Sequence, residues 1–234
     1  MWGKDGPTFL ELAHQALSGT ARGYDLLAPK FEATPFCTPE PVLERTLSDL
    51  GQVRQALDLC CGTGMSFGPL RTIVTDRIVG VDFSEGMLAV AREKIGLSQK
   101  PQIELIHRDI LSFDGGAAFD LVTCFGALGH FPEQDEPRFL SCVRNALKPG
   151  GRFVFLTSDL PPLWSRRRIV SRLFNAAMHV RNALVQPPFV MYYLTFLLPD
   201  IERHLKWHGF DVAVHRGLFE KPFDELVRIV ATKR

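Results

Sequence analysis

The chain has 234 residues, of which 46% are hydrophobic and 23% charged, and its formal net charge is +1. This length suffices for one sizeable core, and the near-neutral charge excludes a general electrostatic attraction to nucleic acid. The five cysteines, an odd number without a C-x-x-C pair, disfavour both a disulfide framework and a zinc site of ordinary spacing.

Two segments of the sequence give information about the cellular location of the protein. The N-terminal MWGKDGPTFLELAHQ has early acids and no long apolar core, so it does not resemble a signal peptide. The apolar stretch 183–200 is interrupted by Gln186, Pro187 and Pro188, which predicts that it does not cross a membrane. Together with the reduced cysteines, these features lead us to expect a cytoplasmic protein.

The first 50 residues have a helical pattern with a Pro-rich interruption within 21–41. From residue 55 on, apolar runs with β-compatible residues alternate with amphipathic helical patterns. The runs are 55–59, 77–83, 102–107, 119–125 and 151–158. Such alternation is typical of an α/β fold with a mostly parallel sheet that helices cover on both faces.

Two helices between these runs have clear ends. Ser84 can cap the first, and Gly96 closes it. The second carries an apolar stripe from Phe139 to Leu147 and is expected to end at the Pro-Gly-Gly of residues 149–151. Near the C-terminus, a helix that stops at Gly209 precedes two strands, 211–217 and 225–234, expected to form a hairpin.

The segment 166–181 combines five arginines with an apolar stripe. The stripe is formed by Ile169, Val170, Leu173, Phe174 and Ala177. We interpret the segment as an amphipathic cap helix with a solvated basic face. An anionic-substrate pocket and contact with a membrane surface that carries a lipophilic substrate are alternatives.

The stretch ALDLCCGTGMSFG, residues 56–68, predicts a ligand-binding loop at the end of the first run. Its spacing does not fit a nicotinamide dinucleotide, because Phe67 stands where the third glycine would be. It does not fit a triphosphate loop either, because no Lys-Ser/Thr pair follows. Asp58 would repel a pyrophosphate but suits a cationic amino-acid group.

Two further acids follow the next two strands. Asp82 ends the second run, where a carboxylate can accept both hydroxyls of a ribose. Asp109 follows the third run and can accept a hydrogen bond from an exocyclic amine, with Ile110 beside a flat ring. The three acids together match a nucleoside with an amino-acid tail and no phosphate.

Five motifs of the chain belong to a known series: LDLCCGTG, VGVDFSEGML, HRDI, FDLVTCFGALGHF and LKPGGRFVF. In these motifs the chain resembles class I S-adenosylmethionine-dependent methyltransferases, and especially their ubiquinone- and menaquinone-biosynthesis-like small-molecule group. The resemblance covers roughly residues 20–160 and, more loosely, 190–234. It implies a Rossmann-like seven-stranded sheet whose last strand is antiparallel, and S-adenosyl-L-methionine as cofactor with S-adenosyl-L-homocysteine as product.

The resemblance also assigns cofactor-binding residues. The methionine end would be held by Asp58, Gly62, Thr63 and Gly64, and the ribose by Asp82. The adenine would meet Phe83, Met87, Asp109 and Ile110. The wall near the sulfonium would be formed by Phe125 and Gly126, and Tyr24 would close over the cofactor.

For the remaining candidate residues, a purely structural role is an alternative to a role in binding or catalysis. Cys60 stands where many relatives have glycine, and we interpret Cys60 and Cys61 as packing beneath the loop. His130 is a candidate general base, although a structural or cofactor-contacting role stays open. His204 and His208 are four residues apart, but no third ligand is evident, so we expect no metal.

The expected function is transfer of a methyl group to O, N or C of a small, aromatic or lipophilic molecule, mainly by proximity and orientation. A macromolecular methyltransferase and a non-catalytic cofactor-binding partner subunit are the alternatives. Candidates for the substrate wall are Trp164, Phe189, Tyr192 and Tyr193. We expect no nucleic-acid partner, a monomer or homodimer, and at most peripheral membrane contact.

We expect the whole chain to form a single methyltransferase domain. Its expected parts are an N-terminal helical lid (1–50), a cofactor-binding core (51–159), a substrate-cap insertion (160–200), and a C-terminal helix and strand hairpin (201–234).

Overall fold

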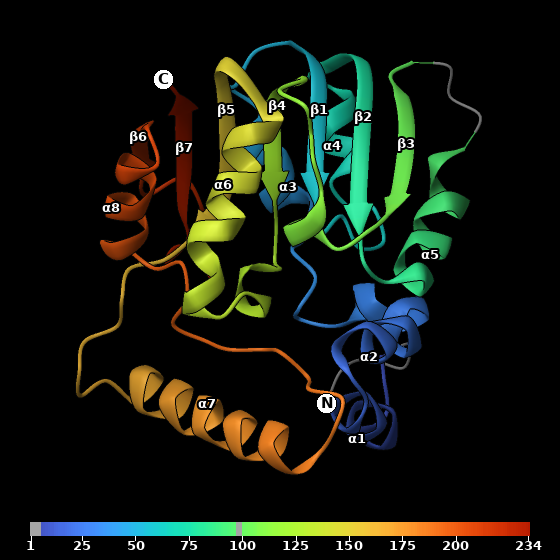
Figure 1. Cartoon of the computed structure of the whole chain (residues 1–234), viewed down its shortest axis with the longest axis vertical. Helices are drawn as coiled ribbons and strands as arrows, with labels where there is room; N and C mark the ends of the chain where they lie inside the picture. The colour runs from blue at the N-terminus through green and yellow to red at the C-terminus, as the bar shows by residue number, and fades with distance from the viewer. Residues whose placement is uncertain (1–5, 97–99) are drawn as a thin grey trace.

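Seven strands form one sheet in the order β3-β2-β1-β4-β5-β7-β6 (Figure 1). The structure is a computed structural model that describes residues 6–96 and 100–234. The strands are β1 (Val53–Leu59), β2 (Val74–Asp82), β3 (Gln102–His107), β4 (Phe119–Cys124), β5 (Leu147–Thr157), β6 (Phe210–His215) and β7 (Val227–Lys233). Strands β1 to β5 pair in parallel, whereas β7 lies antiparallel between β5 and β6. The predicted α/β sheet with an antiparallel last strand is therefore confirmed.

Helices cover both faces of this sheet. On one face lie α3 (Glu40–Leu47), α4 (Phe67–Arg71) and α5 (Glu85–Ile95), and on the other lie α6 (Glu136–Ala146) and α8 (Asp200–Trp207). The central strands are buried on both sides, which explains their continuous apolar sequence. The largest fully buried side chains include Phe139 of α6 and Phe153 and Phe155 of β5.

The helix predicted after residue 135 ends earlier than expected. α6 stops at Ala146, and Leu147 already belongs to β5 with an extended backbone. The strand then passes through Pro149-Gly150-Gly151, where its register with β4 shifts between Phe119 and Leu121. Leu147 thus packs in the core from a strand rather than from the helical stripe.

The N-terminal helices lie across the carboxyl ends of the parallel strands (Figure 1). They are α1 (Phe9–Leu17), α2 (Thr20–Leu27) and the 3-10 turn η1 (Ala28–Ala33). Asp25 Oδ1 of α2 accepts hydrogen bonds from Ser84 Oγ at 2.6 Å and from the Gly86 amide at 2.9 Å. The α2 helix is thereby docked on the start of α5. The first five residues of the expected lid lie outside the described residues.

The Arg-rich segment forms α7 (Arg166–Leu184), which begins at the Ser165 cap as an isolated helix below the sheet (Figure 1). The predicted helix exists, and Arg166, Arg167 and Arg172 of its basic face are exposed, but much of its apolar stripe is exposed as well. None of its residues is buried, and Val170 and Leu173 of the apolar stripe are 64% and 66% exposed. Within the described residues, no helix is long and apolar enough to span a membrane.

We predict that Gly86→Ala detaches α2 from α5. A Cβ at Gly86 would lie 2.7 Å from the Asp25 Cα and 2.9 Å from its carbonyl oxygen, so backbone must move. We expect faster amide hydrogen exchange at residues 20–34 with unchanged protection of the sheet. Gly68→Ala in α4 is the matched control, because its Cβ meets only the end of the Glu40 side chain. Equal exchange of the lid in both variants would contradict this docking.

Candidate functional site

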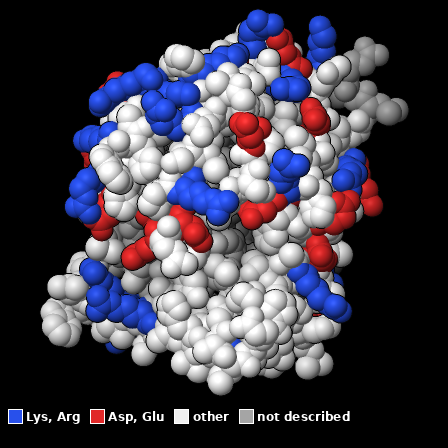
Figure 2. Space-filling view, in the orientation of Figure 1, with Lys and Arg blue, Asp and Glu red and all other residues white. Residues whose placement is uncertain are grey.

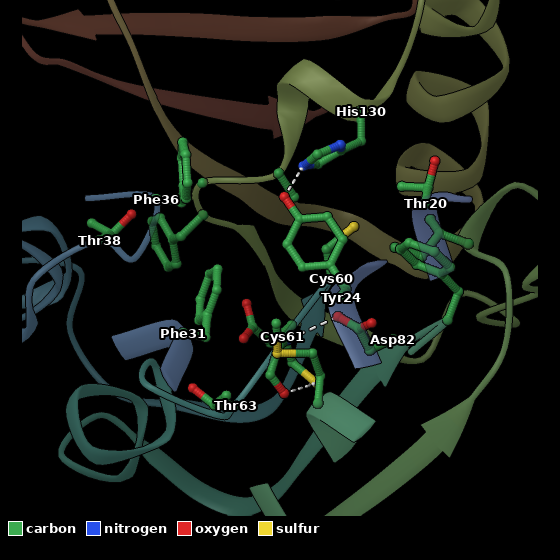
Figure 3. Close-up of a pocket in the computed structure, with 18 of the residues that line it drawn as sticks. Thr20, Tyr24, Phe31, Phe36, Thr38, Cys60, Cys61, Thr63, Asp82 and His130 are labelled. Carbon is green, nitrogen blue, oxygen red and sulfur yellow. Dashed lines mark hydrogen bonds between the residues drawn. The ribbon is translucent and has the colours of Figure 1, made fainter. Parts of the chain in front are cut away.

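A cavity of about 390 Å³ lies at the carboxyl ends of β1, β2 and β4, within the range of small-molecule sites. Its floor is the loop after β1, and its roof comes from α2, η1 and the segment 36–38 (Figure 3). The site therefore combines the sheet edge with the N-terminal helices, which are far apart in sequence.

The loop after β1 turns sharply through three left-handed residues. Cys60, Gly62 and Gly64 have φ values of 55°, 52° and 77°. A Cβ at Gly64 would lie 2.7 Å from the Phe67 ring, so only glycine fits between loop and helix. A Cβ at Gly62 would meet only the edge of Phe31 at 4.0 Å, which leaves this backbone open to the cavity.

Asp58 lies at the base of the loop and is 2% exposed. Its Oδ1 accepts a hydrogen bond from Thr123 Oγ1 at 2.6 Å, and its Oδ2 accepts one from Ser66 Oγ. Burial raises the pKa of Asp58 to about 6, even though both hydroxyl donors lower it. The carboxylate thus lacks a positive partner among the described residues and is suited to receive one from a ligand.

Asp82 holds the loop from the neighbouring strand. Its Oδ2 accepts the Gly62 amide at 2.9 Å, and its Oδ1 accepts the Ser84 amide at 2.9 Å. It is 4% exposed, and burial raises its pKa although these amides oppose the shift. Each oxygen retains a free lone pair, so the carboxylate can still accept ligand hydroxyls.

The charge of the cavity wall has one sign. The described lining includes the carboxylates of Asp58, Asp82, Asp109 and Asp135, and no lysine or arginine. A pyrophosphate or triphosphate would find no cation there and four acids. The cavity is instead complementary to a ligand that carries positive charge.

The roof is tied to the sheet through Tyr24 and His130, which point toward each other (Figure 3). The Tyr24 hydroxyl lies 2.8 Å from His130 Nε2, and His130 Nδ1 lies 2.5 Å from the Val190 carbonyl oxygen. Because Nδ1 faces a carbonyl, it carries the proton, and Nε2 accepts from the phenol. Burial lowers the pKa of His130 and raises that of Tyr24, so both are held neutral.

The predicted cofactor residues converge on this cavity. All of them except Gly64 line it: Tyr24, Asp58, Gly62, Thr63, Asp82, Phe83, Met87, Asp109, Ile110, Phe125 and Gly126. Gly64 lies behind the loop against Phe67. Asp109 caps the 3-10 turn η2 (Ile110–Ser112) through the Leu111 amide, and His130 ends η3 (Leu128–His130).

None of the four aromatics predicted for the substrate wall lines this cavity. Trp164 is 90% exposed in the loop before α7, and Tyr193 is 43% exposed. Phe189 packs behind Tyr24, with ring centroids 6.2 Å apart, and Tyr192 bonds His179 and Asn182 of α7. Their chain segment turns toward α7, so only its Val190 reaches the cavity.

Several lining residues, most of them in the roof of the cavity, were not predicted from the sequence. The cavity is also lined by Thr20, Phe31, Phe36, Thr38, Met65, Ser66, Asp135 and Val190. Thr63 Oγ1 donates to Glu32 Oε1 at 2.7 Å, which joins the loop to η1. Phe31 and Phe36 both lie in the Pro-rich interruption. Their clustering could have predicted that this segment covers a site, because aromatic side chains in such a segment need a surface to pack on.

The two cysteines of the loop are in packed surroundings. Cys61 is buried, and Cys60 hydrogen-bonds with Cys124. That hydrogen bond and burial raise the pKa of Cys60, and burial raises that of Cys61, so both stay thiols. These facts support packing as their role. The glycine typical of relatives at position 60 now has a backbone reason, because φ there is 55°.

His204 and His208 do not share a ligand site. His204 Nδ1 lies 3.2 Å from Glu136 Oε2, and His208 Nδ1 faces the His204 carbonyl oxygen at 2.7 Å. Among the described residues, no three His, Cys, Asp or Glu side chains are grouped so that they could hold a metal ion.

Comparisons with known proteins agree with this geometry. A protein-family model described as a methyltransferase domain matches residues 56–151. A "Demethylmenaquinone methyltransferase" of Shouchella clausii is 37% identical over 112 residues, 46% of each chain. One of Oceanobacillus iheyensis is 31% identical over 140 residues, 58% of each chain. The chain thus spans about half the length of the curated relatives it matches.

Two solved structures share the fold over most of the chain. A DhpI–S-adenosylhomocysteine complex has a TM-score of 0.66 at 21% identity, covering 96% of this chain and 98% of that one. Magnesium protoporphyrin IX methyltransferase from Synechocystis PCC 6803, with bound S-adenosylhomocysteine, has a TM-score of 0.60 at 18% identity, covering 83% of each.

The seven-stranded sheet agrees with the fold that these two solved structures share with the chain. The methyltransferase-domain model matches residues 56–151, which include the glycine loop, Asp58, Asp82 and Asp109. Over about half of the chain, the sequence is similar to demethylmenaquinone methyltransferases.

We predict that Cys60→Gly is more stable than Cys60→Ala by about 1 kcal/mol, because the left-handed backbone penalises any Cβ. At an ordinary position the order is reversed, and alanine is better by roughly 0.5–1 kcal/mol. Urea unfolding of the two variants measures the difference. A more stable alanine variant would show that the left-handed turn is not retained.

Proposed function

We propose that the protein is an S-adenosylmethionine-dependent methyltransferase that modifies O, N or C of a small aromatic or lipophilic molecule. The observation that carries this proposal is the cavity wall with four carboxylates and no lysine or arginine among the described lining residues. This wall suits the ammonium and sulfonium charges of the cofactor. The similarity to demethylmenaquinone methyltransferases supports a ring-containing, lipophilic acceptor.

The residues present fit the cofactor. Asp58 is a buried carboxylate without a positive partner among the described residues, so the amino group of the methionine end would ionise it fully. Asp82 has acceptor capacity for ribose hydroxyls, while Met87 and Ile110 offer buried apolar surface to a flat base. The open backbone at Gly62 permits close approach of the ligand.

The chemistry available from this cofactor is a methyl group already activated on a positively charged sulfur. The protein therefore needs to orient the acceptor and exclude water. The α2 helix, Phe31 and Phe36 cover the cavity and would exclude water. His130 would accept a proton from the acceptor at Nε2, once the Tyr24 hydroxyl yields that position or passes the proton on.

We also propose how the chain is organised and where the protein is located. We divide the chain into a lid (1–50), a cofactor-binding core (51–159), an insertion (160–200) and a C-terminal part (201–234) of one domain. We propose a cytoplasmic location, and a monomer or homodimer as the working oligomeric states.

We predict that Asp82→Asn weakens S-adenosylhomocysteine binding roughly 100-fold, because it removes a charged acceptor worth about 1.5–3 kcal/mol per hydrogen bond. Titration calorimetry measures the affinity. Asp76→Asn is the matched control, because Asp76 lies at the other end of β2 and pairs with Arg54 at the surface. Absence of binding by the unaltered protein would overturn the proposed function. Equal affinity of both variants would overturn the role of Asp82.

We predict that His130→Ala lowers kcat about 10²–10⁴-fold with little change in cofactor affinity. In the unaltered protein, burial holds the His130 pKa below its ordinary 6.5, so activity should fall only as pH drops below that lowered pKa. This acidic limb should vanish in His130→Ala. Tyr24→Phe keeps the ring and should cause a smaller loss.

Release of S-adenosylhomocysteine against a panel of phenols, quinone precursors and amines, at several pH values, measures both effects. His215→Ala, on the edge strand β6, controls for loss of a histidine elsewhere. A His130→Ala enzyme with unaltered kcat and an intact acidic limb would show that His130 is purely structural.

A further inference from the structure

The α7 helix points a stripe of four apolar side chains outward, whereas Phe174 of the predicted stripe packs against the Tyr193 ring, with centroids 4.8 Å apart. Ile169, Leu173, Val180 and Leu184 are 44%, 66%, 60% and 79% exposed, and their spacing puts them on one helix face. A helix on the surface of a globular protein normally turns such a stripe toward the core. Here the stripe points away from the rest of the chain.

The opposite face of α7 is fixed by polar contacts. Asn175 bonds the backbone of Tyr193 through both its amide nitrogen and its oxygen, each at 2.8 Å. Asn182 accepts the Phe189 amide at 2.9 Å and donates to the Phe189 carbonyl oxygen at 3.1 Å. These paired bonds hold the helix in its inverted orientation, since rotation would leave the asparagines and the loop backbone without these partners.

The exposed apolar surface continues beyond α7. Leu163 and Trp164 in the preceding loop are 57% and 90% exposed. On α1, Phe9, Leu10 and Leu17 are 77%, 78% and 61% exposed. Arg181 joins the two helices by donating to the carbonyl oxygens of Ala16 and Ser18, at 3.0 and 2.8 Å. We call this set, with the stripe of α7, the apolar end surface.

The charged side chains of α7 itself are positive. The α7 sequence contains five arginines and no aspartate or glutamate. Arg166 and Arg172 flank the stripe, are exposed, and form no ion pair within residues 6–96 and 100–234. Figure 2 shows this end of the molecule, over α7 and α1, as largely uncharged with Lys and Arg at its margins. An apolar face edged by arginines and an exposed tryptophan matches the boundary of an anionic lipid bilayer.

We propose that the apolar end surface binds an anionic membrane. Self-association through this surface is less suited, because it would bring two basic helices together. The surface adjoins the cavity, since Thr20 follows α1, Val190 follows α7, and both line the cavity wall. On the proposed function, this placement would let a lipophilic acceptor enter from the bilayer without crossing water.

The test is sedimentation with phosphatidylcholine vesicles, with and without phosphatidylglycerol, at low and high salt. We expect salt-sensitive binding only to the anionic vesicles, with a blue shift of Trp164 fluorescence in a Trp2→Phe, Trp207→Phe background. Arg166→Glu with Arg172→Glu should weaken binding at least tenfold, and Leu173→Ser with Val180→Ser should also weaken it.

The matched control is Arg138→Glu with Arg203→Glu, which makes the same charge change on α6 and α8. This control and both α7 variants should keep the S-adenosylhomocysteine affinity of the unaltered protein. Failure to bind anionic vesicles, or equal binding by the Arg166→Glu, Arg172→Glu variant, would overturn the proposal. So would conversion of a vesicle-free dimer to a monomer by Leu173→Ser with Val180→Ser. Vesicle binding without methyl transfer to any acceptor would contradict only the proposed function.

Discussion

The Asp82 carboxylate is the interaction on which the site depends. It accepts one amide from the loop after β1 and one from the start of α5, so a single side chain joins two neighbouring strand ends. The glycine loop can then turn back beneath the cavity with its backbone exposed to a ligand. Because Asp82 is buried and forms no ion pair with the described residues, it costs stability to keep charged. A ligand that brings hydroxyl donors would offset that cost.

The roof of the cavity is also held in place by side-chain hydrogen bonds. Asp25 bonds the cap of α5, Glu32 bonds Thr63, and Tyr24 bonds His130, and these contacts help to hold the N-terminal helices over the loop. Each contact joins a roof residue to a residue near a strand end. The cavity is thus formed by the N-terminal helices and by the strand-end loops, which are far apart in the sequence, and its closure depends on hydrogen bonds between them. Such bonds contribute about 1 kcal/mol each, which suits a cover that opens and closes.

The orientation of α7 follows from hydrogen bonds, whereas the helices that cover the sheet are oriented by burial of their apolar residues. Its asparagines satisfy the backbone of the 189–193 segment, and this requirement outweighs the burial of its apolar stripe within the chain. The stripe, Trp164 and the exposed apolar residues of α1 belong to the apolar end surface. On the proposed function, a surface that binds a membrane would link the location of the protein to the solubility of its acceptor, since lipophilic molecules are concentrated in the bilayer.

By itself, the sequence determined the α/β sheet, the cap and extent of α5, and the acids and glycines of the cavity floor. These features depend on local patterns: apolar runs, a serine cap, and short motifs at strand ends. Only the tertiary structure decided the end of α6, the roof residues, the Tyr24–His130 pair, and the outward face of α7. The reason is that helix periodicity tells which residues share a face but not where that face points. Likewise, residues 24, 130 and 190 meet only once the lid, the sheet and the segment after α7 are packed together.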